Sequence, residues 1–552
     1  MTNYHAVSNS GLLGSSHGVG GAMVQQRRLR SPKMGGGQAS MMSSNINLVN
    51  TIIGAGTLAM PLAMSKFGVT LGVILIVWCG LTSAFGLYLQ SRCTRYLDRG
   101  SSSFFALSQI TYPNAAVVFD AAIAIKCFGV GVSYMIIIGD LMPAVAAAFG
   151  AGNTGWDFLA DRRFWITVFF VIFLIPLSFP KKLDSLKYTS LVALFAIGYL
   201  IILVVYHFAV DDKSGRGPIR LVTWEGPVAA LSSLPVMIFA YTCHQNMFSI
   251  VNEIKDNSPG SLVGVIGSSI GSAASVYVLV AITGYLTFGD AIQGNIVGMY
   301  PQSLASTIAK AAIVFLVTFS VPLQVHPCRA SIDAVLRWRS GRSSRTQNVY
   351  SPPGSGNQPL LPAGGAPSAT LDSHGAPVVA MSELRFALIT SGILILSYFT
   401  AINVSSLDRV LAYVGSTGST AISFILPGLF YYKISDPESN HHQRLTKEDD
   451  DAEYSTSSSS SSASVSDGDE EEGTPGPSGS GAGLGDSIAS LRSHTGSVGS
   501  RLARKLKRKW RWDLEHLETG LLRKMALGLS IYGVIVMVVC LGMNVVLGHG
   551  GH

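Results

Sequence analysis

Charged residues are scarce in this chain, at 13% of 552 residues, whereas hydrophobic residues make up 48%. With a mean hydropathy of +0.39, this composition excludes a set of soluble domains and indicates a protein that crosses a membrane several times. The net charge of +7 does not come from a folded basic module, which argues against nucleic-acid binding. The first ~40 residues are polar and lack the short apolar core of a cleavable signal peptide, so no such peptide is expected.

Cysteine is also rare, with six residues in the whole chain. None has a partner in a predicted outer loop, so we expect no disulfide framework. None has metal-ligand spacing, so we expect no metal and no cofactor beyond a coupling ion. No nucleophile and base are placed together either, and the chain is therefore not expected to be an enzyme.

Eleven apolar segments are long enough, at about 20 residues, to span a bilayer as helices. Their approximate bounds are 43–65, 69–91, 114–148, 163–180, 188–208, 225–252, 262–288, 303–328, 383–402, 407–432 and 522–547. The sequence therefore predicts an all-α polytopic membrane protein with eleven transmembrane helices.

The basic residues of the short loops orient the chain, because cytosolic loops of membrane proteins carry an excess of lysine and arginine. If the N-terminus is cytosolic, the cytosolic side receives the larger basic groups, which are Arg92, Arg95, Arg99, Lys181, Lys182, Lys187, Arg329, Arg337, Arg339, Arg342, Arg345 and the run from Arg501 to Arg511. The opposite side receives fewer, and aspartates partly balance them. We predict a cytosolic N-terminus and a lumenal C-terminus.

Two long polar inserts interrupt the predicted spans. Residues 340–380 are rich in Ser, Gly, Pro and Gln, and residues 433–500 hold acidic clusters and a serine run. Neither can bury a core, so both are predicted to be disordered, as are residues 1–42. The second insert is either a passive linker or a target of acid-directed kinases. Residues 43–432 would then form a core of ten helices, and 501–552 a basic segment with the eleventh.

A glycine-broken apolar segment runs from Asn47 to Pro61, within the first span. Gly54 and Gly56 fall near its middle, and Asn50, Thr51 and Thr57 surround them. A membrane anchor has no reason to weaken its helix there, whereas a transporter does, because an unwound turn exposes backbone amides and carbonyls that can hold a zwitterion and a cation. The alternative is a helix-packing face, since small residues let helices approach closely.

Without the last span, the other ten divide into five plus five, so the first and sixth spans occupy corresponding positions. The sixth span carries Thr242-Cys-His-Gln-Asn246 at its centre, where polar side chains are costly in a bilayer. Corresponding spans of an inverted repeat that are both interrupted at mid-membrane depth point to a transporter binding site. Five-span units have opposite orientations, so the two broken centres can meet.

These residues carry a family resemblance. The segment from Asn50 to Pro61 resembles the first-span signature of the amino acid/auxin permease superfamily, and Thr242–Asn246 resembles its sixth-span motif. Matching segments occur in the third span, Ala124–Gly129 and Ile138–Pro143, and in the eighth, Val317–Pro322. The chain is most similar to the fungal vacuolar amino-acid transporters, with the system A/N neutral amino-acid transporters as cousins. The resemblance implies a LeuT-type 5+5 inverted repeat plus one extra helix.

The predicted substrate site uses main-chain groups of both breaks. Amides of Gly54, Ala55 and Gly56 suit a substrate carboxylate at the N-terminus of a half-helix. Carbonyls of the sixth span suit the substrate ammonium, and other side chains complete the pocket. The predicted residues are Thr51, Gly54, Ala55, Gly56, Thr57, Phe239, Ala240, Tyr241, Thr242 and His244. His244 is either a hydrogen-bonded structural histidine or a proton participant, because imidazole changes charge near neutral pH.

Five residues are candidates for ion binding or coupling: Asn50, Thr318, Ser320, Lys126 and Asp140. The resemblance places the first three where relatives hold a sodium ion, and their oxygen ligands suit a hard cation. Lys126 and Asp140 are fourteen residues apart and project to within about 40° on one helical face. Lys126 either occupies a cation site permanently or pins a helix end by bonding to carbonyls.

The sequence therefore predicts a transporter that takes an amino acid as its substrate and works in a lipid bilayer. The resemblance implies proton-driven transport across a vacuolar or lysosomal membrane. The alternatives are an amino-acid sensor, whose conformation the cytosolic inserts would transmit, and a sodium-coupled transporter of the plasma membrane. A sensor should carry a structured partner-binding tail, which the polar, repetitive inserts do not indicate.

Overall fold

The computed structural model describes residues 37–97, 100–150, 157–180, 189–210, 216–337, 381–439, 441–443 and 520–546. Within them, the regular secondary structure is helical, apart from an isolated parallel bridge between Ala39 and Ile254. The predicted all-α class is confirmed. Of the segments predicted to be disordered, residues 1–36 of 1–42, the 340–380 insert and residues 444–500 of 433–500 lie outside the described residues, as does the basic run 501–511. The ends of the first and last of these segments are described, and they include the start of α1 at Met41 and the end of α16 at Ile434.

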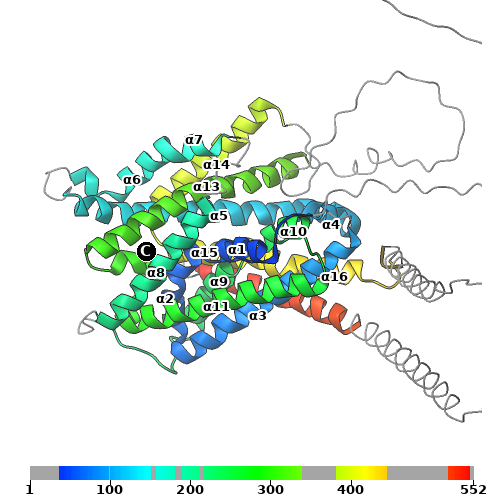
Figure 1. The fold of residues 1–552 in the computed structure, drawn as a ribbon, viewed down its shortest axis with the longest axis horizontal. Helices are drawn as coiled ribbons and strands as arrows, with labels where there is room; N and C mark the ends of the chain where they lie inside the picture. Colours follow the sequence, from blue (N-terminus) through cyan, green and yellow to red (C-terminus); the bar gives the residue numbers. More distant parts are fainter. Residues whose placement is uncertain are drawn as a thin grey trace, which may run out of the picture. The chain divides into compact units, whose positions relative to one another are not determined.

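Long helices form most of the chain (Figure 1). Those that run without a break are α3 (Val69–Cys93), α5 (Ala116–Ala148), α8 (Thr189–Val210), α11 (Pro259–Phe288), α13 (Leu304–Arg337), α14 (Glu383–Asn403) and the C-terminal helix Gly520–Val546. Two of them, α11 and α14, begin at a serine N-cap, whose short side-chain oxygen accepts a first-turn amide. Ser258 accepts from the amide of Ser261, and Ser382 accepts from that of Arg385.

Other spans are interrupted. The first is α1 (Met41–Ile52) followed by α2 (Ala55–Phe67), and the sixth is α9 (Pro227–Ala240) followed by α10 (His244–Glu253). The tenth combines α15 (Leu407–Val414), the π-helical turns η8 (Gly415–Ser419) and η9 (Ala421–Ile425), and α16 (Leu426–Ile434). The shorter elements are η1 (Thr94–Tyr96), α4 (Phe104–Thr111), η2 (Pro113–Ala115), η4 (Asp157–Ala160), η7 (Gly289–Ala291) and α12 (Ile296–Met299).

The number of spans differs from the prediction. Among the described residues, nine helices are long and apolar enough to cross a membrane, and the bent pair α1 and α2 adds a tenth. The predicted span 163–180 consists of three consecutive pieces of eight, five and four residues: α6 (Arg162–Phe169), the π-helical turn η5 (Phe170–Leu174) and α7 (Ile175–Ser178). This segment is not among the helices long enough to count as a span in the described part of the chain, so the count of eleven is not confirmed.

The broken helices lie among the unbroken ones. Helix α2 packs against α9, and α11 packs against α1, α2 and α3. On the other side, α15 contacts both α9 and α5, and α13 runs alongside α5, as Figure 1 shows. The tenth span approaches α9 closely, because a Cβ on Gly415 would overlap the backbone of Pro235. Both breaks are thereby enclosed by neighbouring helices.

Candidate functional site

The first break lies between Ile52 and Ala55, where α1 and α2 meet at an angle of 55°. The amide of Ile53 still bonds to the carbonyl of Val49, and the amide of Thr57 bonds to that of Gly54 at 3.0 Å. Gly54 begins α2 and supplies no side-chain cap. The first amides of an α-helix have no acceptor within the helix, so the N-terminus of α2 offers donors at the break.

The second break covers Tyr241, Thr242 and Cys243, between α9 and α10. The carbonyl of Phe239 accepts from the amide of Thr242 at 2.9 Å, which closes the end of α9. The carbonyl of Tyr241 accepts from the hydroxyl of Ser83 on α3 at 3.1 Å. Each of these carbonyls keeps a second lone pair for a further donor.

The two breaks lie against each other, as the five-plus-five division predicted. A Cβ on Gly56 would lie 2.6 Å from the Cβ of Ala240 and 2.8 Å from its Cα. The hydroxyl of Tyr277, from α11, lies 2.7 Å from the carbonyl oxygen of Ile52 and 2.7 Å from that of Ala240. The hydroxyl of Tyr277 therefore contacts the C-terminal ends of both α1 and α9.

A second contact joins the two interrupted spans through side chains. The amide Nδ2 of Asn246, on α10, donates to the hydroxyl of Thr51, on α1, at 2.8 Å. Thr51 in turn donates to the carbonyl of Asn47. Thr51 is thus engaged in a polar contact between the two interrupted spans.

The first break has few close neighbours on the side of α5. The nearest neighbour to a Cβ on Gly54 would be the hydroxyl of Tyr134, at 3.8 Å. Gly131, one helical turn before Tyr134, is buried, yet nothing lies within 4 Å of the position of its Cβ. Because residues three apart share a helix face, Gly131 and Tyr134 lie on one side of α5, and we place the candidate substrate position between them and Gly54. Gly56 faces Ala240 instead, so at that position the glycine serves helix packing.

The predicted pocket side chains of the sixth span point toward α3 and η9. The ring of Tyr241 packs close to Gly80 on α3, and its hydroxyl is buried with no partner among the described residues. Thr242 donates to the carbonyl of Ile238 at 3.1 Å. His244 is fully buried, and its Nε2 donates to the carbonyl of Ser83 at 3.2 Å. Its Nδ1 has no partner within the described part of the chain.

The predicted sodium ligands keep acceptor capacity. The side-chain oxygen Oδ1 of Asn50 is buried and accepts no hydrogen bond from any described residue. The hydroxyls of Thr318 and Ser320 donate back to the carbonyls of Val314 and Leu316 of their own helix, at 2.7 and 2.8 Å. Their lone pairs remain available to a cation. Elsewhere in the described residues, no group of three or more His, Cys, Asp or Glu side chains is placed to hold a metal.

Lys126 and Asp140 occupy separate environments on α5. Lys126 is 4% exposed, and the backbone at Gly418 of η8 packs against its Cβ. Among the described residues, none forms a hydrogen bond or ion pair with its Nζ. Asp140 pairs instead with Arg162 of α6, at 3.6 Å. The two residues are about 21 Å apart along the helix, so they do not act as a pair.

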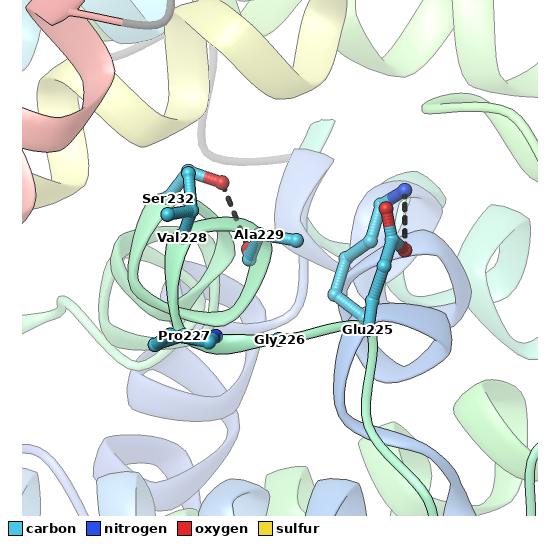
Figure 2. Close-up of a pocket in the computed structure, with 7 residues that line it drawn as sticks. Glu225, Gly226, Pro227, Val228, Ala229 and Ser232 are labelled. Carbon is cyan, nitrogen blue, oxygen red and sulfur yellow. Dashed lines mark hydrogen bonds and ion pairs between the residues drawn. The ribbon is translucent and has the colours of Figure 1, made fainter.

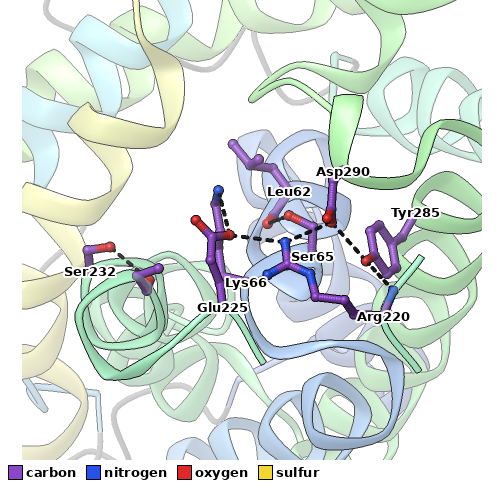
Figure 3. A network of polar contacts seen from close by, with 9 residues as sticks. Leu62, Ser65, Lys66, Arg220, Glu225, Ser232, Tyr285 and Asp290 are labelled. Atoms are coloured by element: carbon purple, nitrogen blue, oxygen red, sulfur yellow. Dashed lines mark hydrogen bonds and ion pairs between the residues drawn. The ribbon is translucent and has the colours of Figure 1, made fainter. Parts of the chain in front are cut away.

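The far end of α2 is held by a network of charges (Figure 3). Arg220, in the loop before α9, pairs with Asp290 at 2.8 Å and with Glu225 at 3.1 Å, and Glu225 pairs with Lys66 at 3.0 Å. Tyr285 of α11 donates to Asp290 and accepts from the amide of Arg220. The hydrogen bond to Asp290 raises the pKa of the Arg220 guanidinium above its ordinary value. Ionic contacts therefore connect the end of α2, the loop before α9 and the turn η7.

A surface hollow of about 470 Å³ adjoins this network (Figure 2). It is lined by Lys66, Glu225 and the first turns of α9. The ion pair within it already satisfies both charged groups, and none of its lining residues belongs to either break. We therefore keep the candidate site at the two breaks.

Sequence reasoning missed three residues of this site: Gly131, Tyr134 and Tyr277. The two tyrosines place hydroxyl groups in the middle of apolar spans, where polar groups tend to have a function. That signal was available, but many spans contain a tyrosine. Only the folded chain shows that these two hydroxyls reach the first break.

The chain is similar in sequence to known transporters of amino acids. The profile of the family described as transmembrane amino acid transporter protein matches residues 37–450. Vacuolar amino acid transporter 6 of Saccharomyces cerevisiae is 43% identical over 425 residues, which cover 74% of this chain and 93% of that protein. Vacuolar amino acid transporter 5 of Schizosaccharomyces pombe is 44% identical over 400 residues, which cover 72% and 86%.

More distant similarities also occur. Sodium-coupled neutral amino acid transporter 7 of Bos taurus is 27% identical over 310 residues, which cover 55% of this chain and 66% of that protein. Among solved structures, the inward-facing conformation of Mhp1 is similar with a TM-score of 0.46 and 13% identity, over 72% of this chain and 77% of the other. A likeness of that size carries no weight for mechanism.

Proposed function

Because this chain belongs to the family of transmembrane amino acid transporter proteins, we propose that it moves amino acids across the vacuolar membrane by alternating access, driven by a proton gradient. The family comprises transporters and not enzymes, as the sequence predicted. The names of the yeast relatives support the vacuolar membrane as its location. The excess of basic residues in alternate loops supports a cytosolic N-terminus and a lumenal C-terminus.

One observation carries the proposal: the two interrupted spans meet at their breaks. The N-terminus of α2 presents amides at Gly54, where, among the described residues beyond its chain neighbours, the Tyr134 hydroxyl is the one atom within 4 Å of the position of a Cβ, and this arrangement suits a carboxylate. Carbonyls freed by the breaks suit an ammonium group. An amino acid carries both groups on one carbon, so a zwitterion matches the polarity of the site. Figure 1 shows that neighbouring helices surround these segments.

The hydroxyl of Tyr134 is the side-chain group placed to complete carboxylate recognition. Replacing Tyr134 with phenylalanine is expected to raise the apparent KM about ten- to a hundredfold, because hydrogen bonds to charged groups contribute roughly 1.5–3 kcal/mol. The maximal rate should change less. Initial uptake rates across a range of substrate concentrations check this prediction.

A matched control comes from Tyr413 of α15, which is partly exposed and bonds to the carbonyl of Asn544. Tyr413→Phe should transport with wild-type kinetics. An unchanged KM for Tyr134→Phe would remove Tyr134 from the site.

Deleting residues 440–495 is expected to leave substrate affinity unchanged, because the sequence predicts that most of this segment is disordered, and a disordered segment would contribute no wall to a binding site. Effects should appear in abundance, trafficking or maximal rate, including any effect of kinases on the serine run. Ligand binding to the purified full-length and deleted proteins checks this prediction. A large loss of affinity in the deleted protein would make the insert part of the transport mechanism.

A counterflow experiment tests whether the protein transports amino acids or only binds them. Proteoliposomes containing the protein are loaded with one unlabelled amino acid at a time, and the entry of the same labelled compound is followed without any ion gradient. A transporter exchanges label for at least one amino acid, and protein-free vesicles do not. A sensor would bind amino acid without exchange, and that result would overturn the proposal.

Sodium coupling is the second candidate mechanism, and one observation favours it. The unpartnered Oδ1 of Asn50 is an oxygen acceptor of the kind that a sodium ion uses, and a distant relative is named as sodium-coupled. We favour proton coupling over sodium coupling because Lys126 places a basic side chain inside the same helical core. A fixed internal charge can replace a bound cation.

A further inference from the structure

Tyr277 lies in the middle of α11, and its side chain is fully buried. Its hydroxyl lies 2.7 Å from the carbonyl oxygen of Ile52 and 2.7 Å from that of Ala240. These carbonyls end α1 and α9. In an unbroken helix each would accept from the amide four residues on, and the breaks remove those amides.

A phenol carries a single proton. The hydroxyl of Tyr277 can donate fully to one of the two carbonyls, while the other faces an oxygen with no proton of its own to share. Three oxygen atoms thus gather around one hydrogen. A buried carbonyl without a donor is costly, so this position favours the arrival of a further N–H donor.

The ring of Tyr277 is held independently of its hydroxyl. It packs edge-on against Tyr241, with ring centroids 5.1 Å apart and planes at 82°. Tyr241 is in turn packed close to Gly80 on α3. Removing the hydroxyl alone therefore leaves the ring in its place and isolates the effect of the hydrogen bond.

We propose that Tyr277 is a positioning residue of the substrate site, which holds the carbonyl ends of α1 and α9 to α11 and leaves one carbonyl for the amino group of the substrate. This inference rests on the proposed function, because the donor it invokes is an amino acid. The structural part of the proposal, that one hydroxyl connects the two breaks, does not depend on the proposed function.

Tyr285 provides a matched control on the same helix. It is also fully buried, but its hydroxyl contacts Asp290 and the amide of Arg220 at the far end of α2. Tyr277→Phe and Tyr285→Phe each remove one buried hydroxyl from α11. Only the first removes a contact with the breaks.

The first arm follows amide hydrogen exchange of the full-length protein in nanodiscs without substrate. Tyr277→Phe should speed exchange at the amides of residues 53–56 and 241–244 by about fivefold or more, because local opening becomes easier when tertiary contacts are lost. Tyr285→Phe should leave these amides as in the wild type. Unchanged exchange in Tyr277→Phe, or the same change in both variants, would overturn the proposal.

The second arm measures the Kd of the labelled amino acid that the wild-type protein exchanges fastest. Tyr277→Phe should weaken binding about ten- to a hundredfold, and Tyr285→Phe should leave the Kd unchanged even if both lower thermal stability alike. Faster exchange with an unchanged Kd would make Tyr277 purely structural and overturn its role in the site. If the wild type binds no amino acid, the proposed function fails, while the first arm still decides whether Tyr277 connects the breaks.

Discussion

Replacing Gly56 with leucine is expected to reduce transport to the background of protein-free vesicles, while the protein still inserts into the membrane. The position of a Cβ on Gly56 lies 2.6 Å from the Cβ of Ala240 and 2.8 Å from its Cα. Backbone cannot yield as a flexible side chain can, so α2 must move away from α9. Overpacking of this kind costs about 1–3 kcal/mol, and here it separates the two breaks that form the site. Counterflow in proteoliposomes measures the loss.

A leucine at another glycine of the same bundle serves as a control, because it shows whether a leucine substitution by itself impairs insertion or transport. Gly271 of α11 is exposed, and nothing lies within 4 Å of the position of its Cβ. Gly271→Leu should therefore insert and transport as the wild type does. If correctly inserted Gly56→Leu shows wild-type kinetics, the two breaks do not need to meet and the proposed site is wrong.

Replacing Lys126 with alanine is expected to abolish accumulation driven by a pH gradient, a loss of at least about tenfold, with protein abundance preserved. Lys126 is buried in the first half of α5, its Cβ lies against Gly418 of the tenth span, and no described residue pairs with its Nζ. An ionisable side chain in the helical core of a membrane protein is costly and commonly functional, so Lys126 is a candidate for a role other than stability. If Lys126 stands in for a bound cation, its removal opens that position.

Lys310 of α13 is the matched control for this variant. It is also buried, at 2% exposure, but its Nζ donates to the carbonyl of Tyr300 at 3.0 Å. Lys310→Ala should lower thermal stability while proton-driven uptake per folded molecule remains. Lys126→Ala should in addition respond to sodium through Asn50, Thr318 and Ser320. If Lys126→Ala keeps full proton-driven accumulation, Lys126 is a structural residue.

The sequence predicted the features that follow from local chemistry. Gly54 and Gly56 weaken the first span, and Thr242 to Asn246 interrupt the sixth, so both breaks were predictable from residue types. Their correspondence also predicted that they would meet, since inverted five-span units have opposite directions. The family resemblance, carried by the same residues, is confirmed by the match over residues 37–450.

Other features depend on packing and could not be read from the residues. Gly54 and Gly56 are alike in sequence, yet among the described residues a Cβ on Gly54 would meet only the Tyr134 hydroxyl, at 3.8 Å, whereas one on Gly56 would overlap Ala240. Tyr277 is separated from both breaks by long stretches of chain, so only the fold brings it to them. The span predicted at 163–180 is not confirmed, because the continuous helical run of α6, η5 and α7 covers only Arg162 to Ser178.

The most direct test of the account is uptake of labelled amino acid by the purified protein in proteoliposomes, with proton and sodium gradients imposed separately. We expect a pH gradient to drive accumulation of the labelled amino acid above equilibrium. Replacing sodium with choline or potassium should change the uptake rate little. Dissipating the gradient with a protonophore should release the accumulated label. Strict dependence on sodium, with no response to an imposed pH gradient, would contradict proton coupling and assign the driving ion to the site at Asn50, Thr318 and Ser320.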